Sequence, residues 1–92
     1  MAQEIVDNPV KRRYELAIDG ALAFVAYRRS PGLITFVHAE VPPALGGRGI
    51  GSRLARAVLE TARANGEKVI PQCSFIAAFI NKNPEFQDLV AA

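Results

Sequence analysis

The hydrophobic period of the chain changes at the glycine-rich segment Leu45–Ser52. Before this segment, apolar residues recur at every second position or form short runs, which is typical of β-strands. From Ile50 onward they recur 4, 7, 8, 11 and 12 residues further along, which describes one face of an α-helix. The sequence therefore predicts a strand-rich first half and a helix-rich second half, joined through the glycines.

Three strands are predicted in the first half, over residues 12–18, 21–27 and 33–41. Asp19-Gly20 separates the first two and favours a type I′ turn, which needs positive φ at both central positions. Ser30-Pro31-Gly32 supplies the second turn. Short turns join antiparallel neighbours, so these strands are expected to form an antiparallel meander.

The long helix is predicted to end at Asn65-Gly66, because glycine readily adopts the left-handed conformation of a helix stop. A short helix is expected over residues 76–80, and Pro84 can open another at its first turn. Phe75, Phe79 and Phe86 are expected to belong to the hydrophobic core rather than to a substrate cage.

Residues 68–75 form a fourth strand candidate, which Pro71 interrupts. A strand that returns through a helix pairs in parallel, so residues 33–41 and 68–74 are expected to be neighbours. The predicted fold class is α/β (α+β), a mostly antiparallel sheet with one long helix after the glycines and short C-terminal helices.

Composition narrows the classes of function. The chain has 92 residues, and we expect a single domain over 1–92. Its one cysteine and one histidine argue against disulfides, structural zinc and iron–sulfur centres, so no metal is expected. No apolar run reaches the roughly 20 residues of a membrane span, and the acidic start is unlike a signal peptide. We therefore expect a cytoplasmic protein with no membrane partner, a monomer or weak dimer.

The net charge of +2 suits an anionic small ligand. No nucleic-acid partner is expected, because the chain lacks tryptophan and its phenylalanines fall at core-like positions. Four glycines lie within residues 46–51, immediately before the helix. Unpaired amides at a helix start favour binding of a diphosphate, to which Arg48 can add a charge-assisted bond. A flexible loop without a ligand is the alternative.

The residues around this loop resemble a known family. Gly46-Gly47-Arg48-Gly49-Ile50-Gly51 resembles the pyrophosphate loop of the GNAT acyltransferases. Together with residues 35–42, 69–75 and 83–90, it is similar to the minimal, YjdJ-like branch of that superfamily over nearly the whole chain. The first loop position is Gly46, where the family has Arg or Gln.

The resemblance implies a GNAT-like fold and acetyl-coenzyme A (coenzyme A) as co-substrate. It implies that backbone amides of the loop hold the pyrophosphate. It also implies that the main chain at Val41 orients the thioester carbonyl. The implied cofactor-binding residues are Val41, Gly46, Gly47, Arg48, Gly49, Ile50, Gly51 and Ser52.

Two ionisable residues precede the loop. Alternation along the third strand predicts Phe36, His38 and Glu40 on one face. Acetyl transfer to an amine needs a base, and Glu40 acting through a water or His38 could take the proton. A solvated strand end and a structural imidazole are the respective alternatives.

Cys73 is the third catalytic candidate, at the end of the strand predicted beside residues 33–41. The resemblance implies that it faces the acetyl group, as a nucleophile or as the acid that protonates the coenzyme A thiolate. Family members often use a tyrosine on the last helix as this acid, but Tyr14 and Tyr27 both lie in the first half. Cys73 could pair with His38, or be a small buried hydrophobe.

The function expected from the resemblance is acetyl-coenzyme A-dependent N-acetyl transfer to an unidentified amine, on a small molecule or on a protein. The enzyme would then be an N-acetyltransferase of the GNAT type. The alternative is a non-catalytic module that binds coenzyme A or its acyl form as a sensor, which the missing tyrosine and Gly46 favour.

Overall fold

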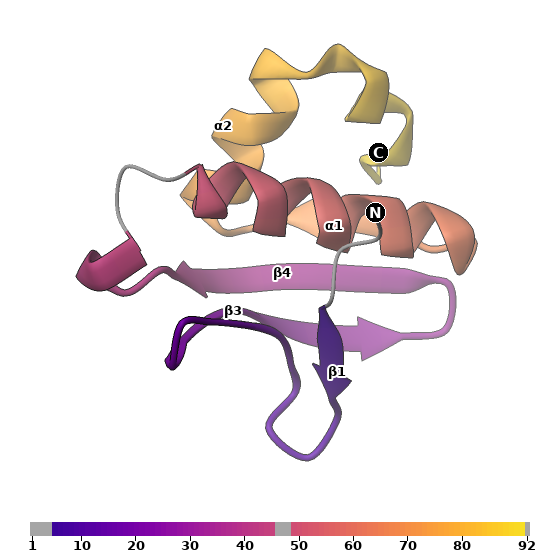
Figure 1. Cartoon of the computed structure of the whole chain (residues 1–92). Helices are drawn as coiled ribbons and strands as arrows, with labels where there is room; N and C mark the ends of the chain where they lie inside the picture. The colour runs from indigo at the N-terminus through magenta and orange to yellow at the C-terminus, as the bar shows by residue number, and fades with distance from the viewer. Residues whose placement is uncertain (1–4, 46–48, 92) are drawn as a thin grey trace.

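A computed structural model describes residues 5–45 and 49–91 of the chain. Five strands form one sheet in the order β1-β2-β3-β4-β5, and α1 and α2 lie on the same side of it (Figure 1). The mixed, mostly antiparallel architecture confirms the predicted fold class. The elements are β1 (Val6–Asn8), β2 (Arg13–Ile18), β3 (Ala21–Ser30), β4 (Leu33–Glu40), η1 (Pro43–Leu45), α1 (Ile50–Ala64), β5 (Lys68–Pro71), α2 (Ser74–Lys82) and η2 (Pro84–Leu89).

The meander of β2, β3 and β4 is confirmed, with antiparallel pairing throughout. Asp19 and Gly20 have φ angles of 53° and 78°, so both central turn residues are left-handed, as a type I′ turn requires. Gly32 has a φ of 72° in the second turn. The turn residues therefore set the register of both hairpins.

Strand β1 is an addition that the sequence pattern does not reveal. It pairs antiparallel with β2, with Val6 opposite Glu15 and Asn8 opposite Arg13. Its three residues are exposed or half-buried, so they carry no apolar alternation. The edge strand forms through backbone pairing to β2, which hydrophobic periodicity does not report.

The parallel pairing of β4 with β5 is confirmed, and Ile34 lies opposite Val69. The predicted extent of the last strand, residues 68–75, is wrong beyond Pro71. Cys73 is instead the N-cap residue of α2, with φ −70° and ψ 124°. Its backbone N–H still donates to the Phe36 carbonyl oxygen at 2.8 Å, so the chain leaves the sheet immediately after this bond.

A β-bulge in β4 overturns the predicted face assignment. Ala26 pairs with His38 and Tyr27 pairs with Phe36, so Val37 is the extra residue. One extra residue reverses the alternation that follows it. Phe36 is therefore fully buried beneath the helices, whereas the His38 side chain is 61% exposed on the opposite, open face of the sheet.

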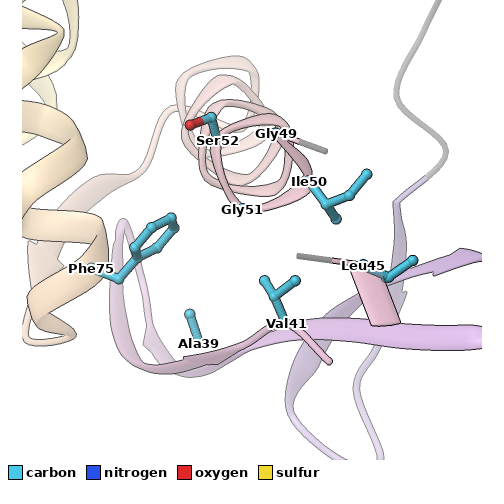
Figure 2. A pocket seen from close by; sticks show the side chains of 8 residues that line it. All are labelled: Ala39, Val41, Leu45, Gly49, Ile50, Gly51, Ser52 and Phe75. Atoms are coloured by element: carbon cyan, nitrogen blue, oxygen red, sulfur yellow. The ribbon is translucent and has the colours of Figure 1, made fainter. Parts of the chain in front are cut away.

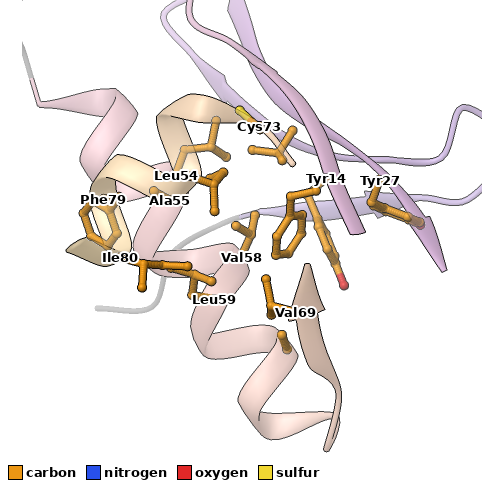
Figure 3. Close-up of a cluster of buried hydrophobic side chains, with 14 of the residues drawn as sticks. Tyr14, Tyr27, Leu54, Ala55, Val58, Leu59, Val69, Cys73, Phe79 and Ile80 are labelled. Carbon is orange, nitrogen blue, oxygen red and sulfur yellow. The ribbon is translucent and has the colours of Figure 1, made fainter. Parts of the chain in front are cut away.

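The core lies between the sheet and the two helices (Figure 3). The apolar face of α1 supplies Leu54 and Val58, both fully buried, which follows from the helical spacing of the sequence. Phe79 and Phe86 are in the core as predicted, with ring centroids 6.1 Å apart. No helix in the described part of the chain is long and apolar enough to cross a bilayer.

Candidate functional site

A pocket of about 420 Å³ opens where the end of β4, η1, the start of α1 and the first turn of α2 meet (Figure 2). Its walls are mostly apolar, and the Ser52 hydroxyl is the polar side-chain group among its described lining residues. The lining residues are Ala39, Val41, Leu45, Gly49, Ile50, Gly51, Ser52 and Phe75.

The first turn of α1 forms one wall of this pocket. Gly49 is the N-cap residue, with φ 70° and ψ 15°, a left-handed conformation that favours glycine. Arg53 N–H makes the first helical hydrogen bond, to the Gly49 carbonyl oxygen at 3.1 Å. The amides of residues 50–52 precede that bond and so lack helical acceptors, and no side chain caps the helix. The positive end of α1 therefore borders the pocket, which suits an anionic ligand.

The opposite wall is the Phe75 ring, at the start of α2. A Cβ atom added to Gly51 would lie 2.9 Å from the ring carbon Cζ, so the ring lies directly against the glycine backbone. Figure 2 shows the ring reaching from α2 toward the first turn of α1. Phe75 is 41% exposed, and the prediction that it belongs to the core is wrong, because its ring lines the pocket.

Five of the eight residues predicted to bind the cofactor line this pocket. The other three, Gly46, Gly47 and Arg48, lie outside the described residues. Ala39, Leu45 and Phe75 also line the pocket, although none of them was predicted to bind the cofactor. Alternation places Ala39 on the same face as Val41, so a signal for Ala39 was present. The pocket residues predicted from sequence are Val41, Gly49, Ile50, Gly51 and Ser52.

His38 and Glu40 lie on the open face, on the other side of β4 from the pocket. The His38 Nε2 and Glu40 Oε2 atoms are 4.0 Å apart, and both side chains are more than half exposed. The ring of Phe24 lies edge-on to the imidazole, with centroids 6.2 Å apart. Both residues fall on the stretch of β4 that continues past its last pairing with β5, at Phe36 and Pro71.

Cys73 is separated from these two residues. Its side chain is 7% exposed and belongs to the core cluster, in which Figure 3 labels it. It does not line the described pocket. No hydrogen bond or ion pair between Cys73 and His38 occurs among the described residues, because the bulge turns the imidazole to the open face. The predicted thiolate–imidazolium pair is therefore not formed in this structure.

The family model of the GCN5-related N-acetyltransferases matches residues 13–89. This chain belongs to that family. It is also similar to a GCN5-like protein from Staphylococcus aureus whose structure was solved by NMR in solution. The two chains are 33% identical, with a TM-score of 0.73, and the alignment covers 98% of this chain and 89% of the other. The family resemblance and the acyltransferase class predicted from the sequence are confirmed.

Both tyrosines of this GCN5-related N-acetyltransferase are engaged away from the pocket. The Tyr27 hydroxyl donates to Asp7, and burial together with this bond raises the pKa of Tyr27 to about 12. The Tyr14 hydroxyl accepts a hydrogen bond from Arg29 Nη2 at 2.7 Å, and burial raises the pKa of Tyr14. Neither hydroxyl lines the described pocket.

The described pocket wall therefore carries no titratable side chain. Within residues 5–45 and 49–91, no group of three or more His, Cys, Asp or Glu side chains could hold a metal ion. The arrangement can hold an anion and an apolar chain, whereas acid–base chemistry must come from groups outside these walls.

Proposed function

We propose that this family member transfers an acetyl group from acetyl-coenzyme A to an amine and that the pocket described above holds the coenzyme. The observation that carries the proposal is the free positive end of α1 at the mouth of an apolar pocket. Several amides that converge on one concavity suit a diphosphate. We infer that residues 49–52 donate to it, together with Gly46, Gly47 and Arg48 of the same loop.

The apolar walls support the same assignment. Ala39, Val41 and Phe75 offer a hydrophobic surface beside the amides, which suits the pantetheine arm and the thioester. β4 extends past β5 here, so its outer edge has no β5 partner in the ladder. We propose that the main chain at Val41 orients the thioester carbonyl, where a donor already in place stabilises the oxyanion.

Because of the bulge, the two faces of β4 carry different candidate groups. Ala39 and Val41 face the pocket, whereas His38 and Glu40 face the opposite side of the same strand. We propose that the acceptor approaches from the open face, where Glu40 or His38 removes a proton from its ammonium group. The amine nitrogen then bonds to the acyl carbon, the carbon–sulfur bond breaks, and the coenzyme leaves as a thiolate that must be protonated.

Cys73 stands where the two strands part, with its N–H bonded to Phe36 just before the bulge. We propose that its thiol meets the acetyl group there, either to protonate the leaving thiolate or to carry the acetyl group. In the first role the acetyl group moves directly to the amine, whereas in the second it passes through a cysteine thioester.

Two glycines at the ends of α1 give a matched test of the coenzyme site. Gly49 and Gly66 have φ angles of 70° and 71°, and a Cβ at either position would meet nothing within 4 Å. Alanine at either site therefore carries similar backbone strain of about 1 kcal/mol. Only Gly49 borders the pocket, so Gly49→Ala is expected to weaken acetyl-coenzyme A binding about tenfold or more, whereas Gly66→Ala leaves it unchanged.

Titration calorimetry and native mass spectrometry would measure this binding, with thermal melts to confirm equal stability losses. Equal effects of the two substitutions on affinity would contradict the site, and no complex with the unaltered protein would overturn the proposed function. A complex without turnover of any amine would leave a coenzyme-binding sensor, the alternative function. Mass spectrometry after denaturation would detect an acetyl group on Cys73.

Cys73→Ala separates a catalytic thiol from a packed one. If the thiol acts on the acetyl group, kcat is expected to fall by roughly a hundredfold or more while the coenzyme Kd stays the same. Free thiol release under steady-state conditions would report kcat. An unchanged kcat in a folded variant would show that Cys73 only packs in the core.

A further inference from the structure

A second pocket lies at the β3–β4 hairpin, with a volume of about 270 Å³ and a lining of Arg28, Arg29, Ser30 and Thr35. Arg28 and Thr35 are paired across the two strands, so their side chains leave the same face of the sheet. Ala26, two residues before Arg28 on β3, pairs with His38. Arg28 and Thr35 therefore share the open face with His38, on the other side of the sheet from the coenzyme pocket.

The groups that line this second pocket are donors. The guanidinium of Arg28 has one hydrogen-bond partner among the described residues, the neutral Gln72 Oε1 at 3.0 Å. Arg29, by contrast, is held by the Glu67 carboxylate at 2.7 Å. No carboxylate is among the described residues that line the pocket, and the hydroxyls of Ser30 and Thr35 complete it. A cation without a counter-charge in the described part of the chain, beside two hydroxyls, suits an oxyanion such as a carboxylate or a phosphate.

Its position relates this pocket to the proposed reaction. Gln72, the partner of Arg28, directly precedes Cys73 at the point where β5 leaves the sheet. Thr35 and His38 lie opposite Arg28 and Ala26, which are two residues apart on β3, so about 7 Å of strand separates them. A single small molecule can therefore span the pocket at one end and the gap between β4 and β5 at the other.

We propose that Arg28, Ser30 and Thr35 bind an anionic group of the acceptor, so that the acceptor is an amine that also carries a carboxylate or phosphate. The anion anchors one end in this pocket, and the amine lies about 7 Å away along the strand, beside His38 and Glu40. This inference rests on the proposed function, because it names the class of acceptor for the same reaction. It adds a binding site on the open face of the sheet.

Anion binding can be tested without turnover. Inorganic phosphate and acetate would be titrated separately into the full chain while amide resonances are followed by NMR. We expect saturable shifts at Ser30 and Thr35 that vanish in Arg28→Gln and persist in Lys82→Gln. The Lys82→Gln control removes the same charge from the last turn of α2, on the helix-covered side of the sheet. Absent shifts, or shifts equal in both variants, would overturn the site. The anion that binds more tightly shows whether the pocket prefers a phosphate or a carboxylate.

Kinetics would then test the acceptor class with amines that differ at one end. Aminohexanoate and aminohexyl phosphate carry an anion at the far end, and hexylamine carries none. Arg28→Gln is expected to raise KM for the preferred anionic amine roughly ten- to a hundredfold at unchanged kcat, and to leave hexylamine unaffected. Arg28→Lys should recover part of the loss, since it restores the charge without the planar fork.

Equal changes for charged and uncharged amines would overturn the role of Arg28 in acceptor binding. Failure of the proposed function has a different signature. In that case acetyl-coenzyme A would not bind at the α1 pocket, whereas the phosphate and acetate titrations would still report on Arg28, Ser30 and Thr35 directly.

Discussion

The missing side chain at Gly51 lets the Phe75 ring lie against the first turn of α1, and this contact shapes one side of the pocket proposed to hold the coenzyme. Glycine inside a helix costs about 1 kcal/mol relative to alanine. The chain therefore carries a less stable helix start at the position where the ring approaches within 2.9 Å of a hypothetical Cβ. An alanine Cβ at position 51 would clash with the outer edge of the Phe75 ring, and this partly exposed ring can move aside.

A double-mutant cycle at Gly51 and Phe75 tests whether the lower helix propensity of glycine is offset by the contact with the ring. In the Phe75→Ala background, Gly51→Ala is expected to raise the free energy of unfolding by up to about 1 kcal/mol, because the ring is gone and only helix propensity remains. In the native background the gain should be smaller or absent, because the ring must shift. Urea unfolding would measure both, and the same gain in the two backgrounds would show that the contact carries no energy.

At the scale of elements, a bidentate ion pair joins α1 to η2 near the C-terminus. Arg63 Nη1 and Nη2 donate to the two Asp88 carboxylate oxygens at 2.8 and 3.0 Å. The hydrogen bond from Arg63 holds the pKa of Asp88 below its usual value of 3.8. A depressed folded pKa stabilises the fold above the unfolded pKa, and this stabilisation is lost as the pH falls through the folded pKa.

Asp88→Asn is accordingly expected to lower stability slightly at neutral pH. The difference from the native chain should disappear in acid, below pH 3.8, where Asp88 itself becomes protonated. Glu60→Gln is a suitable control, because it also removes an exposed carboxylate. The ion pair of Glu60 with Arg56 is longer, at 3.9 Å. Thermal melts over a pH series would check this, and a difference that grew in acid would contradict the sign.

At the scale of the whole molecule, a charge network ties together the end of the sheet opposite the proposed coenzyme pocket. Arg29 on β3 bonds to Glu67, which precedes β5, and lies 3.6 Å from Asp7 on β1. Its guanidinium also stacks 4.6 Å from the centre of the Tyr27 ring. Glu67 is 8% exposed and its Oε1 has no partner among the described residues, so the carboxylate depends on Arg29.

Arg29→Met should therefore destabilise the fold by about 2 kcal/mol, less than for a fully buried pair because Arg29 is itself one-third exposed. Adding Glu67→Gln should recover part of this loss, because the buried charge is removed with its partner. Urea unfolding would measure both, and acetyl-coenzyme A affinity should stay unchanged in each. A double variant less stable than Arg29→Met alone would contradict the account.

Much of the architecture could be predicted because it depends on local signals. The change of hydrophobic period located the sheet and α1, and Asp19-Gly20 specified its turn by backbone conformation alone. The return through a helix implied the parallel pairing of β4 and β5. The glycines before α1 likewise pointed to the pocket that Gly49 and Gly51 line, since a helix start with free amides is a property of the chain itself.

Other features depend on pairing between distant segments, which periodicity does not encode. The bulge at Val37 arises from the register of β3 against β4, and it moves His38 and Glu40 to the face opposite the pocket. Phe75 lines the pocket because α2 begins one residue before it, where the chain has left the sheet. Within residues 5–45 and 49–91, Arg28 has no carboxylate partner because the acids packed nearby pair with Arg29. The sequence by itself determined the β2–β4 meander, α1 and the glycines before it, whereas tertiary packing decided which face each candidate reactive side chain occupies, because one extra residue in a strand reverses all the faces that follow.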